Sequence, residues 1–535
     1  MTRRFSRLVL GLTTMLAGAL VCLATVTPAD AQQPRRGGTL TVITPSDVST
    51  FDPHPAVGFS VRVFANIYEP LFRKDEKGVL HGQLAQSWRM LDPTRLQVTL
   101  RKGVKFHSGN ELTAEDVKFT YERQLNPADL ARDAAVIKML KTPIQVVDRY
   151  TLILETREPN AALVDTLAQS LATLIPESAE IRKWGKDYGL HPSGTGPFKF
   201  VEWVRGQHVK LARNPDYWNG PAHLDFLVFK VVPEEATRVL ALESGEADVL
   251  FETPPSAIAP LKKNPKVRVN RVPTYRDVNV HWNAMKAPTD DARLRRALSQ
   301  AIDVKSIVEE VITADIGQVA TGIFNPSVFG ACDVGFPVYN LTRAKQGLAE
   351  LGYRPGRDGI LEKDGRPLTL TLVVNPQRDP RNGEVAEAIQ AQLRAVGVDM
   401  KVNANEFATY MKILQSAEGD YNMIFHGYGV ATADADLKAT FFLSTNLPPA
   451  GQNSPRFASP ELDGVILAAQ REANKDKRRE LYCKMGQIYR DQALGLPLYA
   501  SFRNTTVGTH VNGMVLHPDE WYTQTYTRVW LGPKP

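Results

Sequence analysis

The sequence predicts an α/β protein built from two lobes. The chain has 535 residues, and a single hydrophobic core stops growing at about 250–300 residues. Hydrophobic residues make up 43% of the chain and charged residues 23%, which is a globular composition and excludes the disordered, collagenous and coiled-coil classes. Strand and helix patterns alternate between residues 368 and 425. This order is typical of a parallel sheet with helices on its faces.

The first 31 residues have the order of a secretory signal peptide. A basic start precedes an apolar run over residues 8–26, and Ala29-Asp30-Ala31 follows as a small-x-small cleavage pattern. The alternative is an uncleaved N-terminal membrane anchor, because the apolar run is nearly long enough to cross a bilayer. Glycines and threonines dilute the run, so we expect export with cleavage after Ala31.

Charge and cysteine content exclude further classes of protein. The net charge is +6, which over so long a chain is too weak to indicate nucleic-acid binding. Three cysteines exclude a disulfide-dense scaffold and a multi-cysteine zinc or iron–sulfur module. Cys22 lies in the leader, where lipidation is an alternative, although Val21 is larger than the residue that normally precedes an acylated cysteine. Whether Cys332 and Cys483 pair is left open, since an exported compartment permits a disulfide but the sequence gives no distance.

Residues 36–280 mix short strands with helices. An acidic residue three positions after Thr113 resembles a capping box, and it predicts a helix from there through Tyr121. Alternating or continuous apolar runs between turn residues predict the strands. These strands are expected over residues 39–43, 96–100, 145–154, 208–211 and 226–231.

The second half of the chain has the clearer pattern. Apolar residues recur with helical spacing over residues 293–311 and predict one amphipathic helix. Strands are then expected over 368–372, 398–402 and 421–425, with helices over 384–396 and 407–415 between them; Gly397 is expected to end the first of these helices.

Polar and aromatic residues follow two strands of the predicted parallel sheet. In open parallel sheets, ligands bind beyond the carboxyl ends of the strands, and here those ends are residues 375–378 and 426–429. Arg378 could clamp a carboxylate through two hydrogen bonds. Tyr428, between Gly427 and Gly429, could offer a flat aromatic face with backbone close by. The alternative is that Arg378 is a loop charge in water and that Tyr428 caps the core.

Local catalytic signatures are absent from the sequence. It contains no P-loop, no H-E-x-x-H, no G-x-S-x-G and no C-x-x-C. The ten histidines are scattered singly; His281 and His426 flank the apparent site and are weak candidates. We therefore expect a protein that is not an enzyme and that needs no cofactor or metal. The rival hypothesis is an exported hydrolase acting on peptides or small amides, because a catalytic triad needs no local spacing.

Eight short motifs occur in order along the chain. They are residues 84–88 (LAQSW), 101–109 (RKGVKFHSG), 112–117 (LTAEDV), 194–198 (GTGPF), 213–218 (RNPDYW), 242–248 (LESGEAD), 291–298 (DARLRRAL) and 301–303 (AID). Together they resemble the signature of the periplasmic solute-binding proteins of the peptide/nickel ABC importer family, the extracellular solute-binding proteins of family 5. The resemblance spans residues 36–535.

The resemblance implies a type II periplasmic-binding-protein-like fold. In such a Venus flytrap, two α/β lobes are joined by a two-strand hinge and close on a ligand. The crossing strands would lie near residues 275–283 and 497–502. The implied boundaries are a signal peptide over 1–31, an N-terminal lobe over 32–280 with 503–535 returning to it, and a C-terminal lobe over 281–502.

The resemblance also implies a role as the substrate-binding component of an ABC importer. The protein would capture peptides or peptide-like small solutes in the periplasm by hinge closure. It would then deliver them to a permease and ATPase complex at the inner membrane. We expect a monomer with no nucleic-acid partner.

Two candidate ligand contacts come from the family's motifs. In peptide-binding relatives an aspartate pairs with the ligand amine, and an alignment of the Gly427-Tyr428 segment places Ala431 at that position. Asp434 lies three residues on and is the remaining candidate for the amine. Arg378 lies near the family's carboxylate-binding arginine. The loop over residues 55–59, which contains Gly58, corresponds to a ligand-contacting loop of the first lobe.

The position of Asp434 bears on the class of ligand. If its side chain faces the ligand, Asp434 and Arg378 would hold a zwitterion, with Tyr428 stacked against it. If Asp434 faces away, the ligand is expected to lack a free α-amine. A modified peptide, an opine-like compound, a metallophore or another small organic solute would then be favoured over a plain dipeptide.

Overall fold

The computed structural model describes residues 33–56, 60–125, 135–168, 171–336, 338–376, 378, 381–427, 433–519 and 525–534. The predicted signal peptide, residues 1–31, lies outside these ranges. Within them, no helix combines the length and the apolar character that crossing a bilayer requires.

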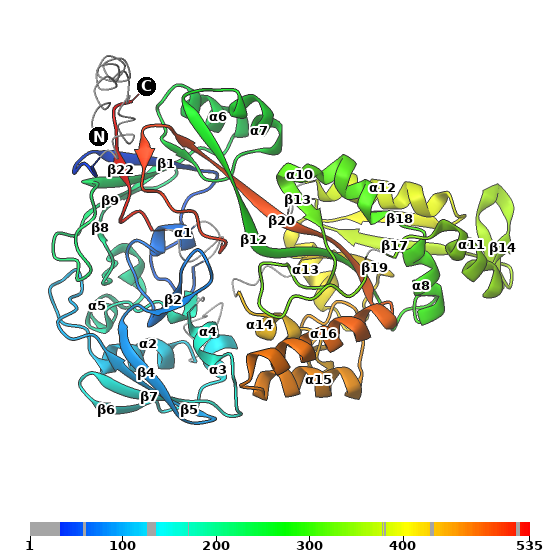
Figure 1. The fold of residues 1–535 in the computed structure, drawn as a ribbon, viewed down its shortest axis with the longest axis horizontal. Coiled ribbons are helices and arrows are strands. Elements are labelled where there is room, and N and C mark those ends of the chain that lie inside the picture. Colours follow the sequence, from blue (N-terminus) through cyan, green and yellow to red (C-terminus); the bar gives the residue numbers. More distant parts are fainter. Residues whose placement is uncertain are drawn as a thin grey trace, which may run out of the picture. The chain divides into compact units, whose positions relative to one another are not determined.

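The described residues form an eleven-stranded mixed sheet (Figure 1). A separate four-stranded sheet consists of β4 (Ala85–Asp92), β5 (Arg95–Leu100), β7 (Thr151–Glu155) and β6 (Gln145–Asp148). The large sheet has the order β18 (Asp399–Ala404), β17 (Thr369–Val374), β19 (Met423–His426), β12 (Val267–Trp282), β20 (Gly495–Gly508), β11 (Val249–Leu250), β1 (Thr39–Thr44), β10 (Phe226–Val231), β9 (His208–Arg213) and β8 (Phe198–Val204), with β13 (Gly317–Val319) paired to β20.

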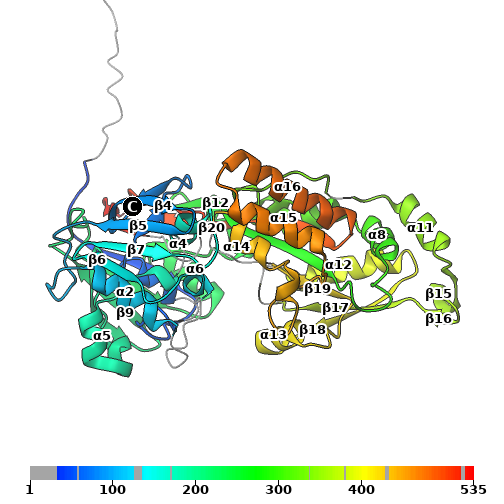
Figure 2. The same cartoon turned by 90° about the horizontal axis from the view of Figure 1, so that it is seen from below.

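Helices pack against these sheets (Figure 2). The α-helices are α1 (Ser60–Phe64), α2 (Ala114–Arg123), α3 (Ala135–Lys138), α4 (Leu163–Leu167), α5 (Ser178–Trp184), α6 (Glu235–Glu243), α7 (Pro255–Lys262), α8 (Ala292–Gln300), α9 (Val304–Ile307), α10 (Thr313–Ile316), α11 (Leu341–Glu350), α12 (Asn382–Arg394), α13 (Phe407–Gln415), α14 (Ala435–Thr440), α15 (Pro460–Arg471) and α16 (Lys475–Asp491).

Two long strands, β12 and β20, run side by side through the middle of the sheet (Figure 1). Their antiparallel pairing extends from Val267 opposite Gly508 to His281 opposite Gly495. The crossing segments expected near residues 275–283 and 497–502 therefore lie in the paired region of β12 and β20.

The buried hydrophobic clusters fall into two sets on either side of this strand pair. One set draws on residues 40–267 and 507–529, and the other draws on residues 275–499. We propose that the two sets are the cores of the two predicted lobes, with boundaries inside β12 and β20 near residues 280 and 503. We call them the first lobe and the second lobe.

The predicted parallel sheet of the second lobe is confirmed. β17 pairs in parallel with β18 and with β19, and α13 begins and ends at the predicted residues. Side chains alternate along β17: Leu370 and Leu372 pack with α12, whereas Val373 packs with Tyr410 of α13 on the opposite face. Burial on both faces is consistent with the run of apolar residues over 372–374 at the end of the strand.

Two predicted elements are wrong in their extent. Residues 145–154 form a hairpin of two strands rather than one strand, because the Asp148 carboxylate accepts a hydrogen bond from the Tyr150 backbone N–H and turns the chain. The helix predicted over 293–311 ends at Gln300. It restarts after Asp303, whose carboxylate accepts from the Ser306 backbone N–H at 3.1 Å and caps α9.

One further local prediction is confirmed, and one open question is answered. The Asp116 carboxylate accepts a hydrogen bond from the backbone N–H of Thr113 at 2.9 Å, which is half of the expected capping box. Cys332 and Cys483, whose pairing the sequence left open, form a disulfide with 5.4 Å between their Cα atoms. This bond ties α16 to a segment 151 residues earlier in the chain.

Candidate functional site

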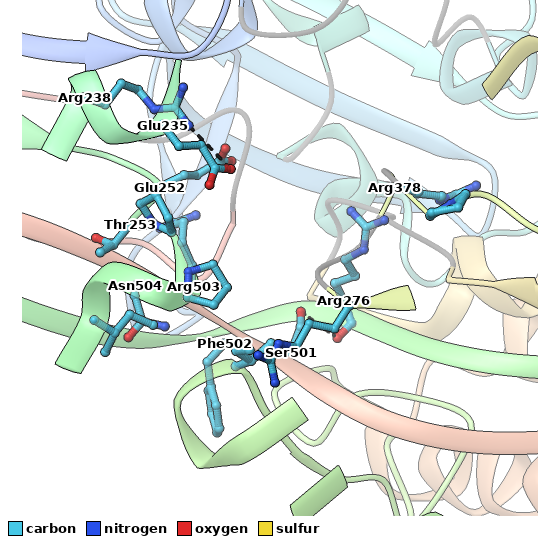
Figure 3. Close-up of a pocket in the computed structure, with 16 residues that line it drawn as sticks. Glu235, Arg238, Glu252, Thr253, Arg276, Arg378, Ser501, Phe502, Arg503 and Asn504 are labelled. Atoms are coloured by element: carbon cyan, nitrogen blue, oxygen red, sulfur yellow. Dashed lines mark hydrogen bonds and ion pairs between the residues drawn. The ribbon is translucent and has the colours of Figure 1, made fainter. Parts of the chain in front are cut away.

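A cavity of about 590 Å³ lies beside the paired strands, between the two lobes (Figure 3). The first lobe contributes side chains from α6, α7 and residues 252–254, and the second lobe contributes Ile316, Pro376, Arg378 and Arg381. Arg276 of β12 and residues 501–504 of β20 complete the described lining. A ligand in this cavity would contact both lobes and the strands that join them.

Arginine dominates the charge of this cavity. Among the described lining residues, five arginines face two glutamates: Arg238, Arg276, Arg378, Arg381 and Arg503 against Glu235 and Glu252. Figure 3 shows Arg276 and Arg378 on one side and Arg238 with the glutamates on the other. Guanidinium groups bind carboxylates through paired hydrogen bonds. The cavity therefore favours a ligand with at least one carboxylate.

Arg378, the predicted carboxylate ligand, lines this cavity and is half-buried. Its Nη2 donates a hydrogen bond to the Gly427 carbonyl at 2.6 Å, and its guanidinium carbon lies 5.8 Å from the centre of the Tyr410 ring. The contact with Gly427 joins the ends of β17 and β19, as the topology predicts. Arg378 is thus held in place by the second lobe while it faces the cavity.

Gly427 is a glycine because the backbone of β12 passes close to it. An added Cβ would lie 2.6 Å from the backbone oxygen of Asp277, closer than van der Waals contact allows. This close approach places the Gly427 carbonyl where Arg378 can donate to it. Gly427 therefore holds the Arg378 guanidinium in this structure, and its direct contact with a ligand stays a prediction.

The histidines beside Arg378 are uncharged at neutral pH. Burial, followed by the charge of Arg378, lowers the pKa of His426 well below its ordinary value. Burial lowers the pKa of His281 to about 3. His281 accepts from or donates to the Tyr489 hydroxyl through Nδ1 at 2.8 Å. Their burial and these contacts indicate packing roles, so the positive charge of the cavity comes from its arginines.

Asp434, the predicted amine ligand, is buried away from the cavity lining. Its carboxylate forms an ion pair with Arg478 and caps α14 by accepting from the Asp436 backbone N–H at 3.0 Å. The guanidinium of Arg478 stacks on Phe329 at 4.5 Å. These contacts engage the Asp434 carboxylate inside the second lobe. The position of Asp434 does not support its predicted contact with a ligand amine, which stays a prediction.

Asp436, beside Asp434, gives the fold a pH dependence. Burial, followed by the charge of Asp434, raises the pKa of Asp436 to about 6. In the unfolded chain the same carboxyl loses its proton at about pH 4. The protonated side chain therefore stabilises the fold fully below about pH 4, and this contribution is lost as the pH rises through about 6.

We expect Asp436→Asn, which resembles the protonated side chain, to unfold a few degrees above the wild type at pH 7.5. At pH 4 the two proteins should unfold together. Thermal unfolding followed by circular dichroism at both pH values makes the comparison. A variant less stable than the wild type at pH 7.5 would contradict this assignment.

Three predicted site residues, Gly58, Tyr428 and Gly429, lie outside the described residues, as does Ala431. Their contacts with a ligand stay predictions. Sequence reasoning missed Arg276 and Arg503, although both lie at or next to the predicted crossing strands. Both could have been predicted as site residues, because a charged side chain at a crossing strand is placed beside the cleft.

Metal-binding geometry is not found in the described ranges: no three His, Cys, Asp or Glu side chains there gather as a metal site.

The chain is similar to known proteins along most of its length. A model of the family "Bacterial extracellular solute-binding proteins, family 5 Middle" matches residues 79–447. The oligopeptide-binding protein AppA of Bacillus subtilis (strain 168) is 29% identical over 507 residues, which cover 91% of each chain. The glutathione-binding protein GsiB of Salmonella typhimurium is 28% identical over 486 residues, covering 89% of this chain and 92% of that protein.

Solved structures agree with these matches. AppA from Bacillus subtilis in complex with a nonapeptide superposes with a TM-score of 0.76 at 25% identity, covering 94% of this chain and all of that one. The periplasmic binding protein DppA from Helicobacter pylori, in complex with the peptide STSA, superposes with a TM-score of 0.76 at 26% identity, covering 93% and 98% of the two chains. The fold is therefore that of type II periplasmic binding proteins.

Proposed function

Because the chain belongs to the bacterial extracellular solute-binding proteins of family 5, we propose that it captures peptides or peptide-like small solutes in the periplasm. It is the substrate-binding protein of an ABC importer, and its family is not enzymatic. The exported hydrolase is therefore set aside. AppA and DppA are named for oligopeptide and periplasmic binding, and both structures hold peptides; this supports a peptide-like ligand here.

One observation carries the proposed ligand chemistry: Arg378 lies in a cavity between the lobes with its guanidinium already held by Gly427. A peptide ends in a carboxylate, and a preorganised guanidinium binds that group with little loss of side-chain entropy. The surplus of arginine over glutamate among the described lining residues draws the same group into the cavity.

Hinge closure follows from the position of the cavity. A ligand shifts a conformational equilibrium only by its difference in affinity for the two states. A peptide can touch both Arg378 and the first-lobe side of the cavity (α6, α7 and residues 252–254, here called the first-lobe wall). It makes its full set of contacts only when the lobes are closed, so it stabilises the closed form. The closed, loaded protein then docks on a permease and ATPase complex at the inner membrane.

We further propose a compartment, an oligomeric state and a set of partners for the protein. After cleavage behind Ala31, the protein works in the periplasm as a monomer, and nucleic acid is not among its partners. A modest net charge of +6 supports the last point, because a nucleic-acid-binding protein of this size would carry a stronger basic excess.

Affinity selection tests the proposed ligand class. The chain without residues 1–31 is incubated with an equimolar library of dipeptides and tripeptides, each with a free carboxylate or as the C-terminal amide, and retained peptides are counted by mass spectrometry. We expect free-carboxylate peptides to be retained at least about tenfold more than their amides, since one charge-assisted contact contributes about 1.5–3 kcal/mol. Equal retention of both forms, or of neither, would contradict the proposal.

A further inference from the structure

Glu252 presents a carboxylate to the cavity from the first lobe. It lies two residues after the end of β11 and lines the cavity opposite Arg378 (Figure 3). Its side chain is 51% exposed, while Arg62, which forms an ion pair with it, is only 4% exposed. The carboxylate therefore stands between a buried guanidinium and the open cavity.

The buried arginines around Glu252 keep it ionised. Desolvation in the cleft works to raise the pKa of Glu252, but the charge of Arg62 and its hydrogen bond, followed by the charges of Arg503 and Arg238, lower it below the ordinary value. Glu252 is therefore an anion at neutral pH. The hydrogen bond from Arg62 orients the carboxylate, as supporting hydrogen bonds orient the residues of a binding site.

On the first-lobe side of the cavity, the carboxylates are more exposed than the guanidinium groups. Arg238 is 7% exposed and donates to the backbone carbonyls of Val232 and Pro233. Arg503 is buried and donates to the His517 carbonyl at 2.6 Å. By contrast, Glu252 and Glu235 are 51% and 66% exposed. The accessible charge of the first-lobe wall is negative, although buried cations support it.

We propose that Glu252 binds the ammonium group of the ligand while Arg378 binds its carboxylate. This assignment rests on the proposed function and deepens it: the ligand is a zwitterion with its ammonium end toward the first lobe. Asp434 is only 3% exposed in its ion pair with Arg478, whereas Glu252 stays 51% exposed. Glu252 therefore supplies an anion that the described second-lobe residues of the cavity lining do not offer. Opposite charges on the two lobes make closure depend on a ligand that carries both groups.

The same peptide library tests this inference with a third form, in which each peptide is N-acetylated. We expect the wild type to retain free-amine peptides at least tenfold more than their acetylated forms. Glu252→Gln should lose this preference and still retain free-carboxylate peptides over amides. Glu202→Gln, a matched change at an exposed glutamate of β8 that is not among the described residues lining the cavity, should keep the preference for a free amine.

The outcomes separate the two proposals. If no peptide is retained, the proposed function falls and this inference falls with it. If peptides are retained through their carboxylates but the wild type holds acetylated and free forms equally, Glu252 has no such role. A preference for free amines that survives in Glu252→Gln also overturns the inference. Thermal unfolding checks that the variant folds; Glu252→Asp, which keeps the charge on a shorter side chain, is expected to show a reduced preference.

Discussion

Replacing Arg378 with alanine is expected to weaken peptide binding by about 2–4 kcal/mol while the fold survives. The guanidinium would be lost from a partly enclosed site, and the ligand carboxylate would be left without its charged partner. The Arg378 side chain touches the Gly427 carbonyl, the Nδ1 atom of His426 and the Tyr410 ring. All three contacts lie at the edge of the cavity, so the variant should remain folded. Calorimetric titration with a peptide selected by the wild type measures the loss.

Two further variants make the Arg378 result specific. Arg394→Ala removes an arginine of α12 that hydrogen-bonds to the Asp358 carbonyl at the surface, and it should leave the affinity unchanged. Arg378→Lys keeps the charge but not the paired hydrogen bonds, so an intermediate affinity is expected. If Arg378→Ala binds peptide as tightly as the wild type, Arg378 is not part of the site.

Replacing Lys438 with methionine is expected to cost about 3–5 kcal/mol of folding free energy. Lys438 of α14 forms a fully buried ion pair with Asp277 of β12 and donates to the Tyr275 carbonyl at 2.9 Å. Burial works to raise the pKa of Asp277 and Lys438 opposes it. Without the lysine, an uncompensated carboxylate would remain inside the protein next to Arg276 of the cavity. Urea denaturation at pH 7.5 measures the change.

An exposed ion pair and a double variant serve as controls for Lys438. Lys286 pairs with Asp420, whose side chain is 86% exposed, and Lys286→Met should change the stability by no more than about 1 kcal/mol. Combining Lys438→Met with Asp277→Asn removes both charges and should restore much of the lost stability. A double variant less stable than Lys438→Met alone would show that the buried charge is not the cause.

Local patterns in the sequence predicted individual elements well. An apolar run between turn residues identified β10 to the residue, and the strand–helix–strand order did the same for α13. The pattern over residues 293–311 gave a helix that is too long, since its apolar stripe continues into the same core across the break at Asp303. Local side-chain contacts, such as the turn at Asp148 and the helix cap at Asp303, interrupt an element without disturbing its hydrophobic period.

The candidate site could be predicted only in part. Arg378 follows the end of a parallel strand, so topology alone places it at the cavity. Glu252 and Arg503 meet there because β11 and β20 pair across more than 250 residues of sequence, and no local spacing encodes that contact. The prediction for Asp434 did not include its ion pair with Arg478, because that arginine lies 44 residues further along the chain.

A crystal structure of the chain without residues 1–31, grown with a peptide selected from the library, would show whether the cavity between the lobes holds the peptide carboxylate at Arg378. We expect peptide density in the cavity between the lobes, with the terminal carboxylate within hydrogen-bonding distance of the Arg378 guanidinium. Density bound elsewhere on the protein, or a peptide in the cavity whose carboxylate points away from Arg378, would contradict it.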